Sequence, residues 1–111
     1  MSQQTNDQIV VLMTAPNAEE ATRIAEMLVE RTLAACVQIL PPITSIYIWK
    51  GEVQRENEIM LVAKSTRAKF DELEDAVRAV HSYETPEIIA VPIVLGSQFY
   101  LSWLSSCLEG S

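Results

Sequence analysis

The chain has 111 residues, 49% of them hydrophobic, and a formal net charge of −7 at pH 7. This length suits one domain, and this apolar content excludes a wholly disordered chain. The acidic balance argues against nucleic acid and anionic membranes as partners, because both are bound through clustered Lys and Arg.

The sequence also lacks signals of export or of membrane insertion. Its first residues, MSQQTNDQ, have neither the basic segment nor the apolar segment of a secretory leader. No apolar run reaches the roughly 20 residues that a membrane helix needs. We therefore predict a cytoplasmic protein with reduced thiols, in which Cys36 and Cys107 are free core cysteines.

The chain begins with the pattern of a strand followed by a helix. Residues 9–14, IVVLMT, form a short β-rich run. Asn17 is the expected N-cap of the helix, and Glu20 completes a capping-box pattern three residues later. Apolar residues then recur at helical spacing, at Ala18, Ala21, Ile24, Ala25 and Leu28.

The next segment predicts a long β-hairpin. A strand over 34–39 is interrupted by two prolines at 41–42, because proline donates no hydrogen bond to a sheet. The β pattern resumes over 43–49, ITSIYIW, and Lys-Gly at 50–51 predicts a turn. Residues 58–65 then return as the second strand of the hairpin.

The rest of the chain predicts a helix, a strand and a last helix. Thr66 opens the first of these helices, whose apolar stripe is Phe70, Leu73, Val77 and Val80. The strand covers 87–94, and Pro92 within it indicates a sheet edge or a strand end. Ser97 caps the last helix. Its apolar stripe is Phe99, Tyr100, Trp103, Leu104, Cys107 and Leu108.

This order predicts an α+β protein with a ferredoxin-like βαββαβ core and an extra C-terminal helix. We expect residues 1–7 to be a disordered tail and residues 8–111 to form one domain. Right-handed crossovers place the first two helices on one face of the sheet. The strands are nearly continuous apolar runs, which indicates burial on both faces, and one terminal helix covers only part of the second face. The chain is therefore predicted to be an obligate oligomer.

Six motifs in chain order resemble those of the CutA family, the divalent-cation tolerance proteins. They are VVLMTAP, LAACVQI, SIYIWKGEV, the E-x5-K of Glu58 and Lys64, HSYETPEI and YLSWL. The resemblance runs from about Ile9 to Leu108. It implies a compact trimer, similar in architecture to the PII signalling proteins, and a role linked to divalent cations or copper.

His81 is the single histidine of the chain. In some CutA members this stretch carries two histidines that bind copper with a cysteine of the first strand, and those positions here are Val80, His81 and Met13. The resemblance thus leaves Met13 and His81 as candidate ligands of copper(I), which accepts soft sulfur. Alternatively, His81 ends the second helix in its cationic form, favoured by the helix dipole, or contacts another ligand. Ser82 stands where the family usually has proline, which should loosen this turn.

A second group of residues is a candidate pocket between subunits. Glu58 and Lys64 are six residues apart on a strand, so they project to the same face. Ionisable groups on an apolar face need partners, so we expect either an ion pair between subunits or a ligand pocket. Carboxylates of the turn near His81 either hydrogen-bond across a subunit boundary or bind a hard cation. The candidate pocket residues are Tyr47, Trp49, Glu58, Lys64, Tyr83, Glu84 and Glu87.

The sequence contains no catalytic arrangement. It pairs no nucleophile with a base and has no glycine-rich phosphate loop, so we predict no enzymatic activity. The leading interpretation is a homotrimer associated with divalent-cation or copper tolerance through weak metal binding. The alternative is a PII-like sensor or scaffold that binds a small metabolite or a partner protein between subunits. That alternative predicts an anionic or nucleotide-like metabolite whose binding depends on Lys64.

Overall fold

The computed structural model describes residues 7–109, which contain five strands and three helices. In chain order these are β1 (Gln8–Ala15), α1 (Ala18–Glu30), β2 (Cys36–Ile39), β3 (Ile43–Trp49), β4 (Glu52–Thr66), α2 (Arg67–Val80), β5 (Ile88–Pro92) and α3 (Gln98–Leu108). Residues 1–6, the larger part of the expected disordered tail, lie outside the described range. Asp7 accepts a hydrogen bond through its carbonyl oxygen from the backbone N–H of Arg67, at 2.8 Å.

The strands form one antiparallel sheet in which β4 has the most neighbours. The order is β2-β4-β1-β5, and β3 pairs with the N-terminal half of β4. Gln8 of β1 lies opposite Thr66 of β4, and Met13 of β1 lies opposite Ile88 of β5. Helices combined with an antiparallel sheet give the α+β class that the sequence predicted.

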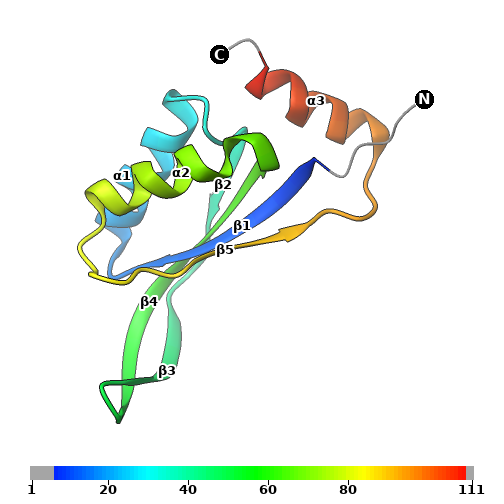
Figure 1. Ribbon diagram of the computed structural model, residues 1–111. Coiled ribbons are helices and arrows are strands. Elements are labelled where there is room, and N and C mark those ends of the chain that lie inside the picture. Colours follow the sequence, from blue (N-terminus) through cyan, green and yellow to red (C-terminus); the bar gives the residue numbers. More distant parts are fainter. Residues whose placement is uncertain (1–6, 110–111) are drawn as a thin grey trace.

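The core lies between the sheet and two helices on one of its faces. Because side chains alternate along a strand, β1 buries Ile9, Val11 and Met13 under the helices, whereas Val10 and Leu12 face the other way and are half-buried. Figure 1 shows α1 and α2 side by side over this face. Their stripes supply the facing residues Ile24, Leu28, Leu73 and Val77.

The opposite face of the sheet is covered only in part. There α3 buries Leu104 and Leu108, and its Ser105 hydroxyl accepts a hydrogen bond from Gln8 Nε2 at 2.9 Å. Large apolar side chains stay exposed on β5, on the connection to α3 and on α3 itself: Ile89, Val91, Val94, Leu95, Phe99 and Trp103. A single chain thus leaves uncovered the apolar surface for which the strand pattern predicted a partner.

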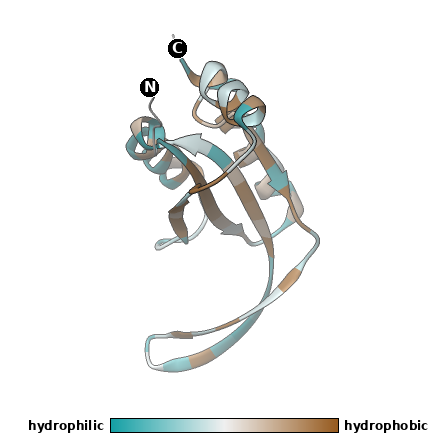
Figure 2. Ribbon diagram, turned by 90° about the vertical axis from the view of Figure 1, so that its right-hand side faces the viewer, coloured by the Kyte–Doolittle hydropathy of each residue, from teal (hydrophilic) through white to brown (hydrophobic). Residues whose placement is uncertain are grey.

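The hairpin of β3 and the first half of β4 stands away from the rest of the protein (Figure 1). Its turn, Lys50-Gly51, has φ values of 52° and 82°, the left-handed region that two-residue hairpin turns require. Hydrophobic and hydrophilic positions are interspersed along it (Figure 2), and Ile48 is 73% exposed. Within residues 7–109, the strand segments 43–49 and 52–58 of the hairpin pair only with each other.

β4 is longer than the sequence predicted, because the expected strand over 58–65 begins in fact at Glu52. Residues 52–57 are polar except for Val53, and none of them is buried, so apolar alternation did not mark them. Pairing with β3 alone makes this segment a strand.

β2 begins at Cys36 and not at residue 34, because the N–H groups of Leu33 and Ala34 still bond to the Leu28 carbonyl at the end of α1.

Candidate functional site

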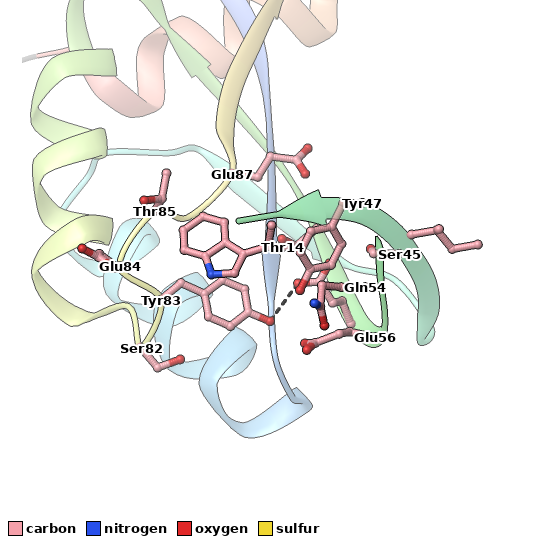
Figure 3. Close-up of a pocket in the computed structure, with 13 residues that line it drawn as sticks. Thr14, Ser45, Tyr47, Gln54, Glu56, Ser82, Tyr83, Glu84, Thr85 and Glu87 are labelled. Atoms are coloured by element: carbon pink, nitrogen blue, oxygen red, sulfur yellow. Dashed lines mark hydrogen bonds between the residues drawn. The ribbon is translucent and has the colours of Figure 1, made fainter. Parts of the chain in front are cut away.

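A pocket of about 770 Å³ lies between the hairpin and the turn formed by residues 82–87. Figure 3 shows side chains of the two segments facing one another, with Thr14 of β1 between them. Ser45, Tyr47 and Trp49 share one face of β3 because side chains alternate along the strand, and this face lines the pocket. The pocket exists because the hairpin is separated from the turn 82–87.

Tyr83 and Glu58 join the two walls of the pocket. The Tyr83 hydroxyl donates a hydrogen bond to Glu58 Oε2 at 2.8 Å, drawn in Figure 3, and Glu58 is 7% exposed. Burial, then the hydrogen bond and charge of Glu58 and the charge of Glu56, raise the pKa of the Tyr83 hydroxyl above its usual value. The phenol therefore stays neutral at physiological pH and satisfies a buried carboxylate.

Carboxylates set the electrostatic character of the pocket. Glu56, Glu84 and Glu87 add three exposed carboxylates to that of Glu58, and no Lys or Arg lines the pocket. Burial, followed by the negative charges of Glu56 and Glu58, raises the pKa of the Tyr47 hydroxyl as well. The pocket therefore attracts cations and repels anions.

The structure brings together six of the seven pocket residues proposed from the sequence: Tyr47, Trp49, Glu58, Tyr83, Glu84 and Glu87. Lys64 lies elsewhere. It is opposite Cys36 and Val10, and its Nζ donates a hydrogen bond to Gln38 Oε1 at 2.6 Å. Glu58 and Lys64 share a strand face, but six residues of strand span about 20 Å. This pocket therefore gives no basis for an anionic ligand that depends on Lys64.

His81 ends α2, as predicted, with its side chain 1% exposed. Its Nδ1 accepts a hydrogen bond from the Tyr83 backbone N–H at 3.0 Å, so this nitrogen carries no proton. Its Nε2 lies 2.8 Å from the Thr14 carbonyl oxygen, an acceptor, so Nε2 is the donor. These bonds describe a neutral imidazole with both nitrogens engaged, and they correct the cationic form expected from the helix dipole.

Met13, the other candidate copper ligand, is buried on the helix-facing side of β1. A metal ion held by Met13 and His81 would have to displace a hydrogen bond of the imidazole, either to Tyr83 or to Thr14. Within residues 7–109, no group of three or more His, Cys, Asp or Glu side chains is placed to hold a metal ion.

Glu20 holds the turn from the side of α1. Its Oε2 accepts hydrogen bonds from the Ser82 N–H at 2.9 Å and the Ser82 hydroxyl at 3.1 Å, and lies 3.4 Å from His81 Nδ1. Only half of the predicted capping box forms, in which Asn17 Oδ1 accepts from the Glu20 N–H at 2.8 Å. Ser82 offers an N–H that proline lacks, so the turn is fastened here and not loosened as expected.

Sequence reasoning missed several residues of the site. Gln54 and Glu56 line the pocket on the same strand face as Glu58, and Thr14 and Thr85 complete its floor and rim. Gln54 and Glu56 could have been predicted from the sequence. If the strand is extended back to residue 52, they project from the same face as Glu58. Thr14 and Thr85 could not have been predicted as pocket residues, because neither their residue type nor their spacing distinguishes them.

No helix among the described residues has the length and hydrophobicity needed to cross a membrane.

A family model described as CutA1 divalent ion tolerance protein matches residues 9–107. The divalent-cation tolerance protein CutA of Thermus thermophilus is 50% identical over 95 residues, which are 86% of this chain and 92% of that protein. The protein CutA of Homo sapiens is 42% identical over 97 residues, which are 87% of this chain and 54% of the human protein. The chain thus spans about half the length of this human relative.

Solved structures agree with the sequence matches. The chain is similar to CutA1 from Oryza sativa, with a TM-score of 0.90 and 40% identity over 96% of this chain and 100% of that chain. It is also similar to the divalent cation tolerance protein from Thermus thermophilus, with a TM-score of 0.86 and 49% identity over 87% of this chain and 94% of that chain. The Thermus thermophilus relative is named for divalent-cation tolerance, and none of these names refers to an enzymatic reaction. As its motifs predicted, the chain belongs to the CutA1 family of divalent ion tolerance proteins.

Proposed function

We propose that the protein acts in tolerance of divalent cations, copper among them, in the cytoplasm and without enzymatic activity. The observation that carries this proposal is the family match over residues 9–107, together with the names of the relatives. The acid-lined pocket supports it, because carboxylates without basic neighbours draw cations toward the surface. The free thiols of Cys36 and Cys107 fit a reducing compartment.

Metal binding in this proposal is weak. His81 and Met13 offer copper(I) one imidazole nitrogen and one thioether, and the imidazole gives up a hydrogen bond to bind it. Hard divalent cations meet the exposed carboxylates of Glu56, Glu84 and Glu87. Tight binding of such ions takes six or more converging oxygens, so we expect these carboxylates to concentrate cations and not to enclose one.

We further propose that the working form is a homotrimer of ferredoxin-like subunits, similar in architecture to the PII proteins. The sheet order β2-β4-β1-β5, with α1 and α2 on one face, supports the ferredoxin-like arrangement. Leu95 and Phe99 are 88% and 91% exposed, and Ile48 projects from the hairpin. Large apolar side chains exposed at both places on a chain of this size indicate contacts with other copies.

An anaerobic copper(I) titration against a competing chelator tests the metal proposal. The wild type is compared with His81→Ala and Met13→Leu, and Met27→Leu serves as the control because it removes a thioether from α1 and not from β1 or its neighbouring strands. We expect copper(I) affinity to fall roughly tenfold or more in the first two variants and to be unchanged in the control. Equal affinity in all four proteins, or no binding by the wild type, would refute a site at His81 and Met13.

A further inference from the structure

We propose that the pocket between the hairpin and the turn 82–87 binds a small organic ammonium compound. The cationic group lies against the aromatic walls, and the carboxylates supply the counter-charge. This ligand class goes beyond metal tolerance, and the argument for it needs no metal ion.

The aromatic side chains provide the surface that such a ligand prefers. Tyr47, Trp49 and Tyr83 line the pocket, so three aromatic rings border a space of about 770 Å³. Ammonium groups are attracted to the faces of Trp and Tyr rings within about 6 Å of the ring centroid. The Trp49 ring already attracts a cation from outside the pocket lining, because Lys50 Nζ lies 5.8 Å from its centroid.

The charges of the pocket select the sign of the ligand. Four carboxylates line it, those of Glu56, Glu58, Glu84 and Glu87, without any Lys or Arg. Glu58 is buried and accepts a hydrogen bond from the neutral hydroxyl of Tyr83. Because this partner is neutral, no ion pair with Tyr83 cancels the negative charge of Glu58. An anion entering this space would meet repulsion from both walls, whereas a cation would not.

The same residues favour an organic cation over a bare metal ion. A metal ion needs several converging ligand atoms, and the described residues form no such group of three. An alkylated ammonium group is bulky and weakly hydrated, so it gains contact with the rings without losing a strong hydration shell. The pocket volume also lies in the range of roughly 300–1,000 Å³ that is typical of small-molecule sites.

The pocket wall is fixed before any ligand arrives. Glu20 accepts hydrogen bonds from the N–H and the hydroxyl of Ser82, and His81 Nδ1 accepts one from the N–H of Tyr83. The Tyr83 hydroxyl is in turn fixed by Glu58 across the pocket. A preformed wall lowers the ordering cost of binding, which favours a small ligand.

Isothermal titration calorimetry of the assembled protein with two matched probes tests this proposal. The first probe is choline, and the second is 3,3-dimethyl-1-butanol, in which carbon replaces the quaternary nitrogen and the charge is lost. The buffer contains EDTA, so the outcome is independent of the metal-tolerance proposal. We expect choline to bind and its neutral analogue to bind at least about tenfold more weakly. Equal binding of the two probes, or no binding of choline, would overturn the proposal.

Three variants locate the binding in the pocket. Trp49→Leu removes one aromatic face and Glu84→Gln removes one exposed carboxylate, and each should weaken choline binding about fivefold. Glu72→Gln removes the same charge from the exposed surface of α2 and should leave the affinity unchanged. Circular dichroism verifies that each variant is folded. If Glu72→Gln weakens binding as much as Glu84→Gln, net charge and not the pocket attracts choline, and the proposed site is wrong.

Discussion

The carboxylate of Glu20 joins the first turn of α1 to the turn that follows α2. It is buried, and it accepts two hydrogen bonds from Ser82, 62 residues away in the chain. A hydrogen bond to a charged acceptor stabilises a fold more than a neutral one, and removing the acceptor leaves a partly buried donor without a partner.

We expect Glu20→Ala to lower the free energy of unfolding by about 2–3 kcal/mol, because the Ser82 N–H loses its acceptor. Glu19→Ala is the matched control, since Glu19 is the preceding residue of the same helix and forms only an exposed ion pair with Arg23. That variant should change the free energy of unfolding by less than about 0.5 kcal/mol. Urea unfolding at one fixed protomer concentration measures both. Equal losses in the two variants would show that Glu20 acts only as a first-turn acid.

Tyr83 makes stability dependent on pH in the alkaline range. Its pKa is raised in the folded chain above the ordinary 10.0, first by burial and then by Glu58. The folded state therefore keeps a proton that the unfolded state loses above pH 10. The stability from this group is complete below pH 10 and is lost as the pH rises above it.

We therefore expect the unfolding midpoint of the wild type to fall as the pH rises from about 10 to about 12, and to fall less in Tyr83→Phe. Tyr47 and Tyr100 also have raised pKa values, so the variant should retain part of the fall. Thermal unfolding of both proteins over this range measures the difference. Parallel pH profiles would mean that Tyr83 does not couple its proton to folding.

What the sequence could reveal about single residues depended on how local their contacts are. Asn17 was predictable as a cap because its partner is three residues away. Glu20 had the right residue type for a capping box, but its carboxylate bonds a segment that only the tertiary fold brings near. The contact of His81 Nε2 was hidden for the same reason, because the Thr14 carbonyl that accepts its hydrogen bond lies on another strand.

At the scale of elements, contacts within a single chain do not account for the exposed apolar side chains of the hairpin. Ile48 lies opposite Val53 across the hairpin, and both side chains are exposed. An isolated two-stranded hairpin is marginal in water, so an apolar pair at its tip needs further contacts. A second copy of the chain would supply them in the proposed trimer.

We expect Ile48→Lys to reduce the oligomer to smaller species at low micromolar concentration without unfolding the domain. Val29→Lys is the control, because Val29 is an exposed apolar residue of α1 that does not line the pocket beside the hairpin. Multi-angle light scattering gives the mass of each variant, and circular dichroism verifies the fold. A trimer that persists in Ile48→Lys would place the hairpin outside the interface.

The helices and the edge strand were predictable, and the extent of the hairpin was not. Apolar stripes at helical spacing marked α1, α2 and α3 because each buries one face against the sheet. Pro92 marked β5 as an edge strand, and it is the last residue of that strand. Residues 52–57 of the hairpin have no buried side chain, so the sequence pattern does not show that they belong to the strand.

The whole molecule is longer than a compact chain of its size. Its radius of gyration is 14.9 Å, against about 13 Å expected for 111 residues. It measures 50 × 25 × 24 Å, and the hairpin accounts for the long axis (Figure 1). A protruding arm together with an uncovered apolar face suits interlocking copies better than a lone subunit.

We expect stability to depend on protomer concentration, because assembly and folding are linked in the proposed trimer. A hundredfold dilution should lower the free energy of unfolding by about 2 kcal/mol per protomer, following mass action for three copies. Equilibrium urea unfolding at two concentrations, incubated until forward and reverse curves agree, measures this. Superimposable curves would argue for a protein that is stable as a monomer.

The position of β4 in the sheet also decides when the chain can begin to fold during its synthesis. In the part of the chain that the structure describes, β1 pairs with β4 and β5 alone, and the partner of Gln8 is Thr66. The ribosome delivers β1, α1, β2 and β3 before that partner exists, so the apolar first strand stays unpaired while more than half of the chain is made. Sheet formation therefore begins only after β4 emerges, and the nascent chain depends until then on its polar flanks, or on chaperones, to keep β1 from aggregating.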